Sequence, residues 1–185
     1  MSSNTSDENA GDSKSSFGGL YAEKDAVAAA ARALSSLLPP DAVRLVYDGF
    51  SLTSQSGSRT MAFTASGQAI SMTGSSAASQ AFNELRRVMY KPGLGSWWSV
   101  RMTVWADGHA QTEFNFDEEP DNRFPPGGVA YLTDLQTYPI DEDKRPEWLR
   151  RKIVEGIADL RHNGPKSYPR WLKDMIAQGN KPEWL

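Results

Sequence analysis

The side chains best suited to chemistry form one acidic cluster that follows a β-rich run: Asp117, Glu118, Glu119 and Asp121, interrupted only by Pro120. Converging carboxylates bind Ca²⁺ or Mg²⁺, but the calcium-binding loop needs alternate ligands around a central glycine, and that spacing is absent. Three interpretations are open: a solvated acidic loop, a docking surface for a basic partner, and the metal centre of a hydrolase. The metal centre would need further ligands from distant positions, such as Asp48 or Asp134.

Other kinds of catalytic or cofactor chemistry find little support in the composition. The chain has no cysteine, which excludes disulfides, thiolate nucleophiles and thiolate zinc sites. Its two histidines, His109 and His162, fit the end of a hairpin turn and the end of a helix, without the partners of a catalytic triad. The glycine-rich pieces match neither a P-loop nor a dinucleotide fingerprint. We therefore expect a protein that is not an enzyme, with no catalytic residue, no cofactor and no metal.

Length and charge limit the domain count and the kinds of partner. With 185 residues, 39% of them hydrophobic, the chain has room for one ordinary domain and its core. We expect a disordered leader over 1–19, one α+β domain over 20–163, and a helical extension or tail over 164–185. A net charge of −3 gives no basic face for nucleic acid. No apolar run is long enough for a membrane span and the start does not resemble a signal peptide, so we expect a cytoplasmic protein.

The residues that precede the acidic cluster predict a β-hairpin. Two β-rich runs, 97–105 and 109–117, flank a short loop that ends in Gly108. A three-residue loop, with Gly108 left-handed as a bulge, sets Arg101 opposite Glu113 on one face of the hairpin. The other face is then apolar, and a slip of one residue would move that whole row into water. It consists of Trp98, Val100, Met102 and Val104 opposite Phe116, Phe114, Thr112 and Ala110.

The remaining patterns predict the elements around this hairpin. We expect helices over 23–38, 77–90 and 145–162, a strand over 42–52, two short strands or one bent strand over 60–72, and an edge strand over 129–135. In the second helix, Arg86 and Arg87 are expected to point away from the apolar stripe. Together these elements predict an α+β fold. Its antiparallel sheet would have four to six strands, with the hairpin central and the helices packed on one face.

A Pro-x-Trp-Leu pattern occurs three times in the C-terminal third, at 146–149, 169–172 and 182–185. Proline is favoured at the start of a helix, and the tryptophan and leucine that follow would then turn onto the core. The third copy ends the chain, where two interpretations are open: a tail docked on the domain, and a tail that binds a partner.

Several of these segments together resemble the YezG-like immunity proteins, in particular the actinobacterial members. The resemblance covers about residues 86–149. It rests on Arg87-x-Met89-Tyr90-x-Pro92-Gly93-x-Gly95-x-Trp97, on a hairpin with Asp107-Gly108 at its turn, and on Phe114-Asn115-Phe116-Asp117-x-Glu119-Pro120 at its end. It continues through Asp134-Leu135-x-x-Tyr138-Pro139 and Pro146-Glu147-Trp148-Leu149.

The resemblance implies a cytoplasmic antitoxin that binds a cognate polymorphic toxin domain, often a nuclease, and blocks it. A small acidic domain without catalytic motifs fits the basic cleft of such a toxin. The residues expected to bind the toxin are Asp117, Glu118, Glu119, Asp121, Trp97 and Trp105. The alternatives are a non-enzymatic adaptor that uses its tryptophan-rich C-terminal segment and, least favoured, the metal-dependent hydrolase.

Overall fold

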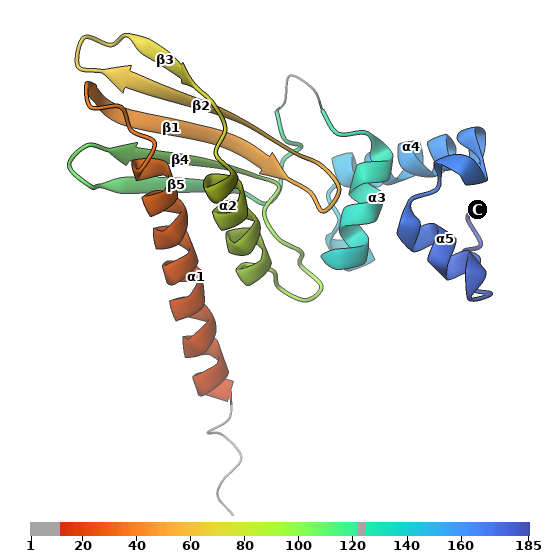
Figure 1. Ribbon diagram of the computed structural model, residues 1–185. Coiled ribbons are helices and arrows are strands. Elements are labelled where there is room, and N and C mark those ends of the chain that lie inside the picture. The colour runs from red at the N-terminus through yellow and green to blue at the C-terminus, as the bar shows by residue number, and fades with distance from the viewer. Residues whose placement is uncertain (1–11, 122–124) are drawn as a thin grey trace, which may run out of the picture.

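The computed structural model describes residues 12–121 and 125–185, which form an antiparallel five-stranded sheet with helices on one face and at one end (Figure 1). The strands are β1 (Ala42–Ser51), β2 (Ser56–Thr64), β3 (Ala69–Met72), β4 (Ser99–Trp105) and β5 (Ala110–Asn115). The helices are α1 (Asp12–Ser35), α2 (Ser76–Val88), α3 (Gly128–Thr137), α4 (Glu147–Asn163) and α5 (Arg170–Ala177), with short 3₁₀ turns at Glu142–Lys144 and Pro165–Ser167. The expected α+β class is confirmed.

The predicted hairpin is present as β4 and β5, and its register is confirmed from Ser99 to Val104. The expected pair of Trp98 and Phe116 is absent, because the Trp98 amide donates to the Asn115 carbonyl instead. Arg101 pairs with Glu113 and Val104 with Ala110, while Gly108 has a φ of +88°. That left-handed value is what the three-residue loop requires, and glycine adopts it without steric cost. The place of the hairpin in the sheet differs from the expectation. The strand order is β3-β2-β1-β4-β5, so β1 is central and β5 forms an edge.

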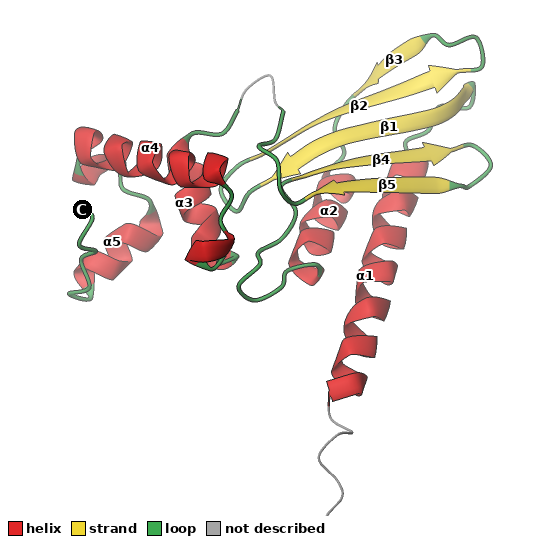
Figure 2. Ribbon diagram, turned by 180° about the vertical axis from the view of Figure 1, so that it is seen from behind, coloured by secondary structure: helices red, strands yellow, loops and turns green. Residues whose placement is uncertain are grey.

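Helices α1 and α2 cover one face of the sheet, and among the described residues no helix covers most of the other face (Figure 2). The first turn of α2 is capped by Ser75, whose hydroxyl accepts a hydrogen bond from the Ala78 amide. Phe82 on α2 stacks on Tyr47 of β1, with 4.1 Å between the ring centroids. The main core fills the space between these two helices and the strands. Its fully buried members include Ala30, Leu34, Leu45, Leu85 and Met102.

The segment 129–135 is a helix, so the prediction of a last edge strand was wrong. Its short apolar run suits either element when judged by periodicity alone, and a distant contact decides between them. Helix α3 packs against α4 through Gly128 and Gly156, where a Cβ on either glycine would overlap the backbone of the other helix. The small residues let the two helices approach closely, and this places α3 beyond the end of the sheet (Figure 1).

The Pro-x-Trp-Leu segments contribute to the packing of the C-terminal helices. Leu149 and Leu172, from the first two copies, are fully buried. The third copy forms a turn that lies against the second, with 6.5 Å between the rings of Trp171 and Trp184. The Arg161 side chain donates a hydrogen bond to the Trp184 carbonyl, at 2.7 Å. The tail is therefore docked on its own domain, which is the first of the two interpretations.

The expected disordered leader over residues 1–19 is corrected for its second part. Helix α1 begins at Asp12, inside the segment 1–19 that was expected to be disordered, and residues 1–11 lie outside the described part of the chain. Within the described residues, no helix combines the length and the apolar character that a membrane crossing requires.

The glycine contact between α3 and α4 gives a first prediction. Replacing Gly156 with alanine should lower the free energy of unfolding by about 1–3 kcal/mol, because the new methyl group meets the backbone of α3. It should do so although alanine is the better helix former by about 1 kcal/mol. Gly19→Ala in α1 is the matched control, since its added methyl group meets no atom within 4 Å. Urea unfolding measures both variants, and equal stability of the two would contradict the close helix contact.

Candidate functional site: the open sheet face and its acidic edge

We call the sheet surface that points away from α1 and α2 the open face. Strand register defines it, because residues paired directly across antiparallel strands lie on the same face. Four strands contribute its central part: Arg44, Val46, Asp48 and Phe50 from β1, Arg59, Met61 and Phe63 from β2, Ser99, Arg101, Thr103 and Trp105 from β4, and Gln111, Glu113 and Asn115 from β5. Phe50, at the end of this surface, is buried in a cluster that includes Tyr131 of α3 and Leu149 of α4, and no helix of the described chain lies over the rest (Figure 2).

Charged side chains make different contacts at the two ends of the open face. Near the start of β1, the guanidinium of Arg44 lies 4.7 Å from the centre of the Phe63 ring. Near the other end, Arg101 forms an ion pair with Asp48, at 2.6 Å between nitrogen and oxygen. Both partners are substantially exposed, so this pair adds little stability but gives the face a fixed pattern of charge. A groove of about 1290 Å³ runs over the charged end and reaches Asp121 in the acidic cluster.

The backbone that leaves β5 is ordered by side chains around it. The Asn115 carboxamide accepts hydrogen bonds from the amides of Asp117 and Glu118, and its nitrogen donates to the Glu118 carbonyl. The Trp148 indole of α4 donates to the Asp117 carbonyl, at 2.6 Å. These bonds fix the acidic cluster at the junction between the edge of the sheet and helix α4.

The four carboxylates of the cluster are not equivalent. Glu119 faces α4, where its oxygens lie 3.1 Å from Arg151 and 3.3 Å from Lys152. Burial acts to lower the pKa of Lys152, but its bonds to Glu155 and Glu119 outweigh that effect and the pKa is raised. The carboxylate of Glu119 therefore forms ion pairs with its own domain, through Arg151 and Lys152 of α4. The carboxylates of the other three, Asp117, Glu118 and Asp121, are exposed at the rim of the open face.

The two tryptophans expected to bind a partner lie in different environments. Trp105 is half-buried on the open face, with its ring 4.8 Å from that of His109. Trp97 is only 1% exposed and packs in the main core, 6.0 Å from Phe114. This corrects the expectation for Trp97, because a side chain enclosed by the core cannot contact a partner in this conformation.

The metal-site interpretation gains no geometric support. Among residues 12–121 and 125–185, no group of three or more acidic or histidine side chains is arranged to hold a metal ion. The two distant positions considered as further ligands form ion pairs of their own. Asp48 pairs with Arg101, and Asp134, which is buried in α3, pairs with Arg86.

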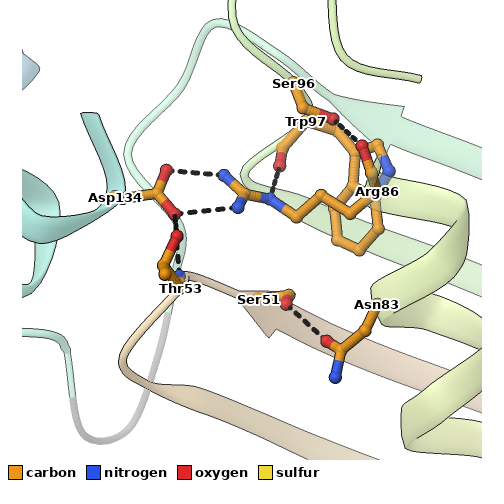
Figure 3. Close-up of polar contacts among 7 residues, drawn as sticks. All are labelled: Ser51, Thr53, Asn83, Arg86, Ser96, Trp97 and Asp134. Carbon is orange, nitrogen blue, oxygen red and sulfur yellow. Dashed lines mark hydrogen bonds and ion pairs between the residues drawn. The ribbon is translucent and has the colours of Figure 1, made fainter. Parts of the chain in front are cut away.

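Asp134 belongs to a buried network that joins α2 to α3 (Figure 3). Its carboxylate accepts two hydrogen bonds from the guanidinium of Arg86, at 2.8 and 2.7 Å. It also accepts from the amide and the hydroxyl of Thr53, in the β1–β2 turn. The Arg86 Nε donates to the Trp97 carbonyl, and the guanidinium lies 4.4 Å from the centre of the Tyr138 ring. Both charged side chains of the network therefore have hydrogen-bonding partners.

The position of Arg86 differs from the sequence prediction, which pointed it, like Arg87, away from the apolar stripe of the helix. Arg86 is 2% exposed, whereas Arg87 lies outside and pairs with Glu84. The signal that could have found it is its spacing, because Arg86 follows Phe82 by four residues and so shares the buried side of α2. A polar hollow of about 380 Å³ opens beside the network, and there the Ser51 hydroxyl donates to the side chain of Asn83 (Figure 3).

The buried pair gives a second prediction. Arg86→Met should lower the free energy of unfolding by about 3–5 kcal/mol, because it leaves the Asp134 carboxylate buried without its counter-ion. Arg87→Met is the matched control: it breaks an exposed pair and should cost about 0–1 kcal/mol. The double variant Arg86→Met/Asp134→Leu should recover part of the loss. Chemical unfolding checks all three, and a loss for Arg86→Met no larger than the control's would contradict the role of the pair.

No protein family matches this chain, and no curated protein sequence matches it either. The functional interpretation therefore depends on the geometry of the open face and the acidic cluster and on the motifs in the sequence.

Proposed function

We propose that this protein is an immunity protein, which binds a cognate toxin domain in the cytoplasm and neutralises it by stoichiometric protein–protein inhibition. The observation that carries the proposal is the open face. Its apolar and charged side chains are left uncovered by the helices of the described chain, and exposed carboxylates line its rim. A face of this kind is open to a protein partner that supplies matching apolar and charged groups.

The charges support a basic partner. Asp117, Glu118 and Asp121 extend from one edge of the open face, and within residues 12–121 and 125–185 no ion pair joins them to a cation, in contrast to Glu119. A toxin that acts on nucleic acid carries a positive cleft, so these carboxylates would draw the two proteins together and raise the association rate. Half-buried aromatic side chains on the face, such as Trp105 and Phe63, supply the apolar contact that slows dissociation.

The sequence resemblance to YezG-like immunity proteins supports the same function independently of the open face. The adaptor alternative has less support, because its proposed tail already packs against Trp171 and is bonded to Arg161. A tail of that kind would have to leave its own domain before it could bind a partner.

The experiment that tests the proposal is affinity capture from the native organism, with the full-length protein as bait and mass spectrometry of what it retains. We expect a protein with a secretion or repeat region followed by a toxic C-terminal domain. Expression of that domain in a neutral host should stop growth, and co-expression of the immunity protein should restore it. Capture without such a partner, repeated under conditions that induce secretion systems, would count against the proposal.

The exposed carboxylates give a third prediction. Reversing Asp117, Glu118 and Asp121 to lysine should weaken binding of the captured toxin domain by about tenfold or more, mainly through slower association. Glu119 is left unchanged, because its reversal would break the contacts with α4.

The matched control reverses Asp25, Asp159 and Glu183, which are exposed carboxylates on α1, α4 and the C-terminal turn. It changes the net charge by the same amount, and we expect it to bind nearly as well as the unmodified protein. Surface plasmon resonance measures both. Equal affinities for the two triple variants would place the interface elsewhere on the molecule.

A further inference from the structure

Strand β5 ends the sheet without a neighbour on its outer side. It pairs with β4 alone, and the only extensive contacts of β5 within the described chain are with that strand. We propose that this edge receives an extended, basic segment of the partner as a sixth, antiparallel strand. The inference rests on the proposed function and deepens it, since it specifies how the toxin domain is held.

The register shows which backbone groups are available for a further strand. The Trp105 amide donates to the His109 carbonyl, and the Ala106 amide donates to the Val43 carbonyl of β1. Odd-numbered residues of β4 therefore bond to β5, and even-numbered residues bond to β1. Because bonded and non-bonded pairs alternate in an antiparallel ladder, the residues of β5 whose amides and carbonyls point outward are Ala110, Thr112 and Phe114.

This edge lacks most of the features that usually prevent strand addition. Protected edges carry charged side chains, lysine above all, or a proline or a bulge, or are very short. The six residues of β5 include neither lysine nor proline, their one charged side chain is Glu113, and their pairing with β4 has no register shift. The opposite edge of the sheet is different, because β3 has only four residues. The sheet therefore offers one edge long enough for a partner strand.

The charges along the edge select a basic segment. From His109 to Pro120 the chain contains neither lysine nor arginine, and the exposed carboxylates of Glu113, Asp117 and Glu118 follow one another along it. The nearest cation across the ladder is Arg101, which is already paired with Asp48. A second copy of this chain would add a strand without any lysine or arginine, so self-pairing at this edge would leave the carboxylates without a basic partner.

The apolar side chains beside β5 indicate which residues should alternate with the basic ones in the partner segment. On the face toward the helices, Phe114 is half-buried and Phe116 is 44% exposed, with 6.2 Å between their rings. A strand added to β5 would place every second side chain beside these two rings and the alternate ones beside Glu113. The occupant is therefore a segment in which apolar or β-branched residues alternate with lysine or arginine.

The fourth prediction uses a defined probe, a short synthetic peptide in which valine and threonine alternate with lysine. On adding it to the full-length ¹⁵N-labelled protein, we expect the amides of Ala110, Thr112 and Phe114 to become protected from hydrogen exchange. Those of Gln111 and Glu113 should be protected already, because they bond to β4. A control peptide with glutamate in place of lysine should not bind. Equal binding of the two peptides, or protection elsewhere than β5, would overturn the proposal.

A pair of variants separates strand addition from attraction by charge alone. Thr112→Pro removes an outward amide that the sheet does not use and obstructs a sixth strand, so it should weaken peptide binding by about tenfold or more. Thr112→Val keeps the amide and should bind as the unmodified protein does. If Thr112→Pro fails to fold, the exchange measurement on the unmodified protein still decides. Dimerisation through β5 without peptide would overturn the choice of occupant.

The same variants distinguish this proposal from the proposed function. If the unmodified protein captures and neutralises a toxin domain and Thr112→Pro does so equally well, strand addition is wrong and the immunity function stands. If the unmodified protein captures no toxin domain yet its β5 amides are protected by the lysine peptide, the edge binds basic strands and the proposed function is wrong.

Discussion

The arrangement of the whole molecule depends on the buried ion pair between Arg86 and Asp134. Two charges lose their water there, and that cost is offset only because the carboxylate accepts four hydrogen bonds and the guanidinium also bonds to the Trp97 carbonyl. Such a network tolerates little displacement of its members. It therefore fixes α3 relative to α2 and to the β1–β2 turn, and through the glycine contact it also fixes α4. The position of α4 in turn decides where Trp148, Arg151 and Lys152 hold the acidic cluster.

The residues that carry the resemblance to YezG-like proteins gather at this junction. Gly93 has a φ of +77° and bonds to the Asp141 amide, and Gly95 packs against Ile140 so closely that a Cβ would overlap it. Tyr138 lies on the Arg86 guanidinium, and Trp148 packs edge-on against Trp98. These are architectural contacts. The resemblance therefore bears on the fold first, because most of its residues hold elements together, and only its last stretch, from Asn115 to Glu119, reaches the open face and the acidic cluster.

The parts of the fold that follow from local rules could be predicted, and those that follow from distant contacts could not. The hairpin register was predictable because alternation and the loop around Gly108 act within a few residues of each other. Helix α3 was not predictable in this way, because its short apolar run suits a strand equally well and its packing depends on Gly156. Arg86 was missed since its counter-ion is far away in the sequence. In the candidate site, the acidic cluster was recognised from composition, but only the structure separates Glu119 from its neighbours.

The sheet offers two surfaces with complementary physical properties. Backbone bonds at the β5 edge provide direction and register, yet any extended segment can form them, so they discriminate poorly between partners. Side chains on the open face and the carboxylates beside it discriminate well, but exposed charges alone give little affinity once salt screens them. Both surfaces meet at Asn115, which caps the acidic turn and ends β5. A partner that adds a strand at β5 would therefore place its basic side chains against Glu113 and Asp117 in the same step, because strand register leaves them no other position.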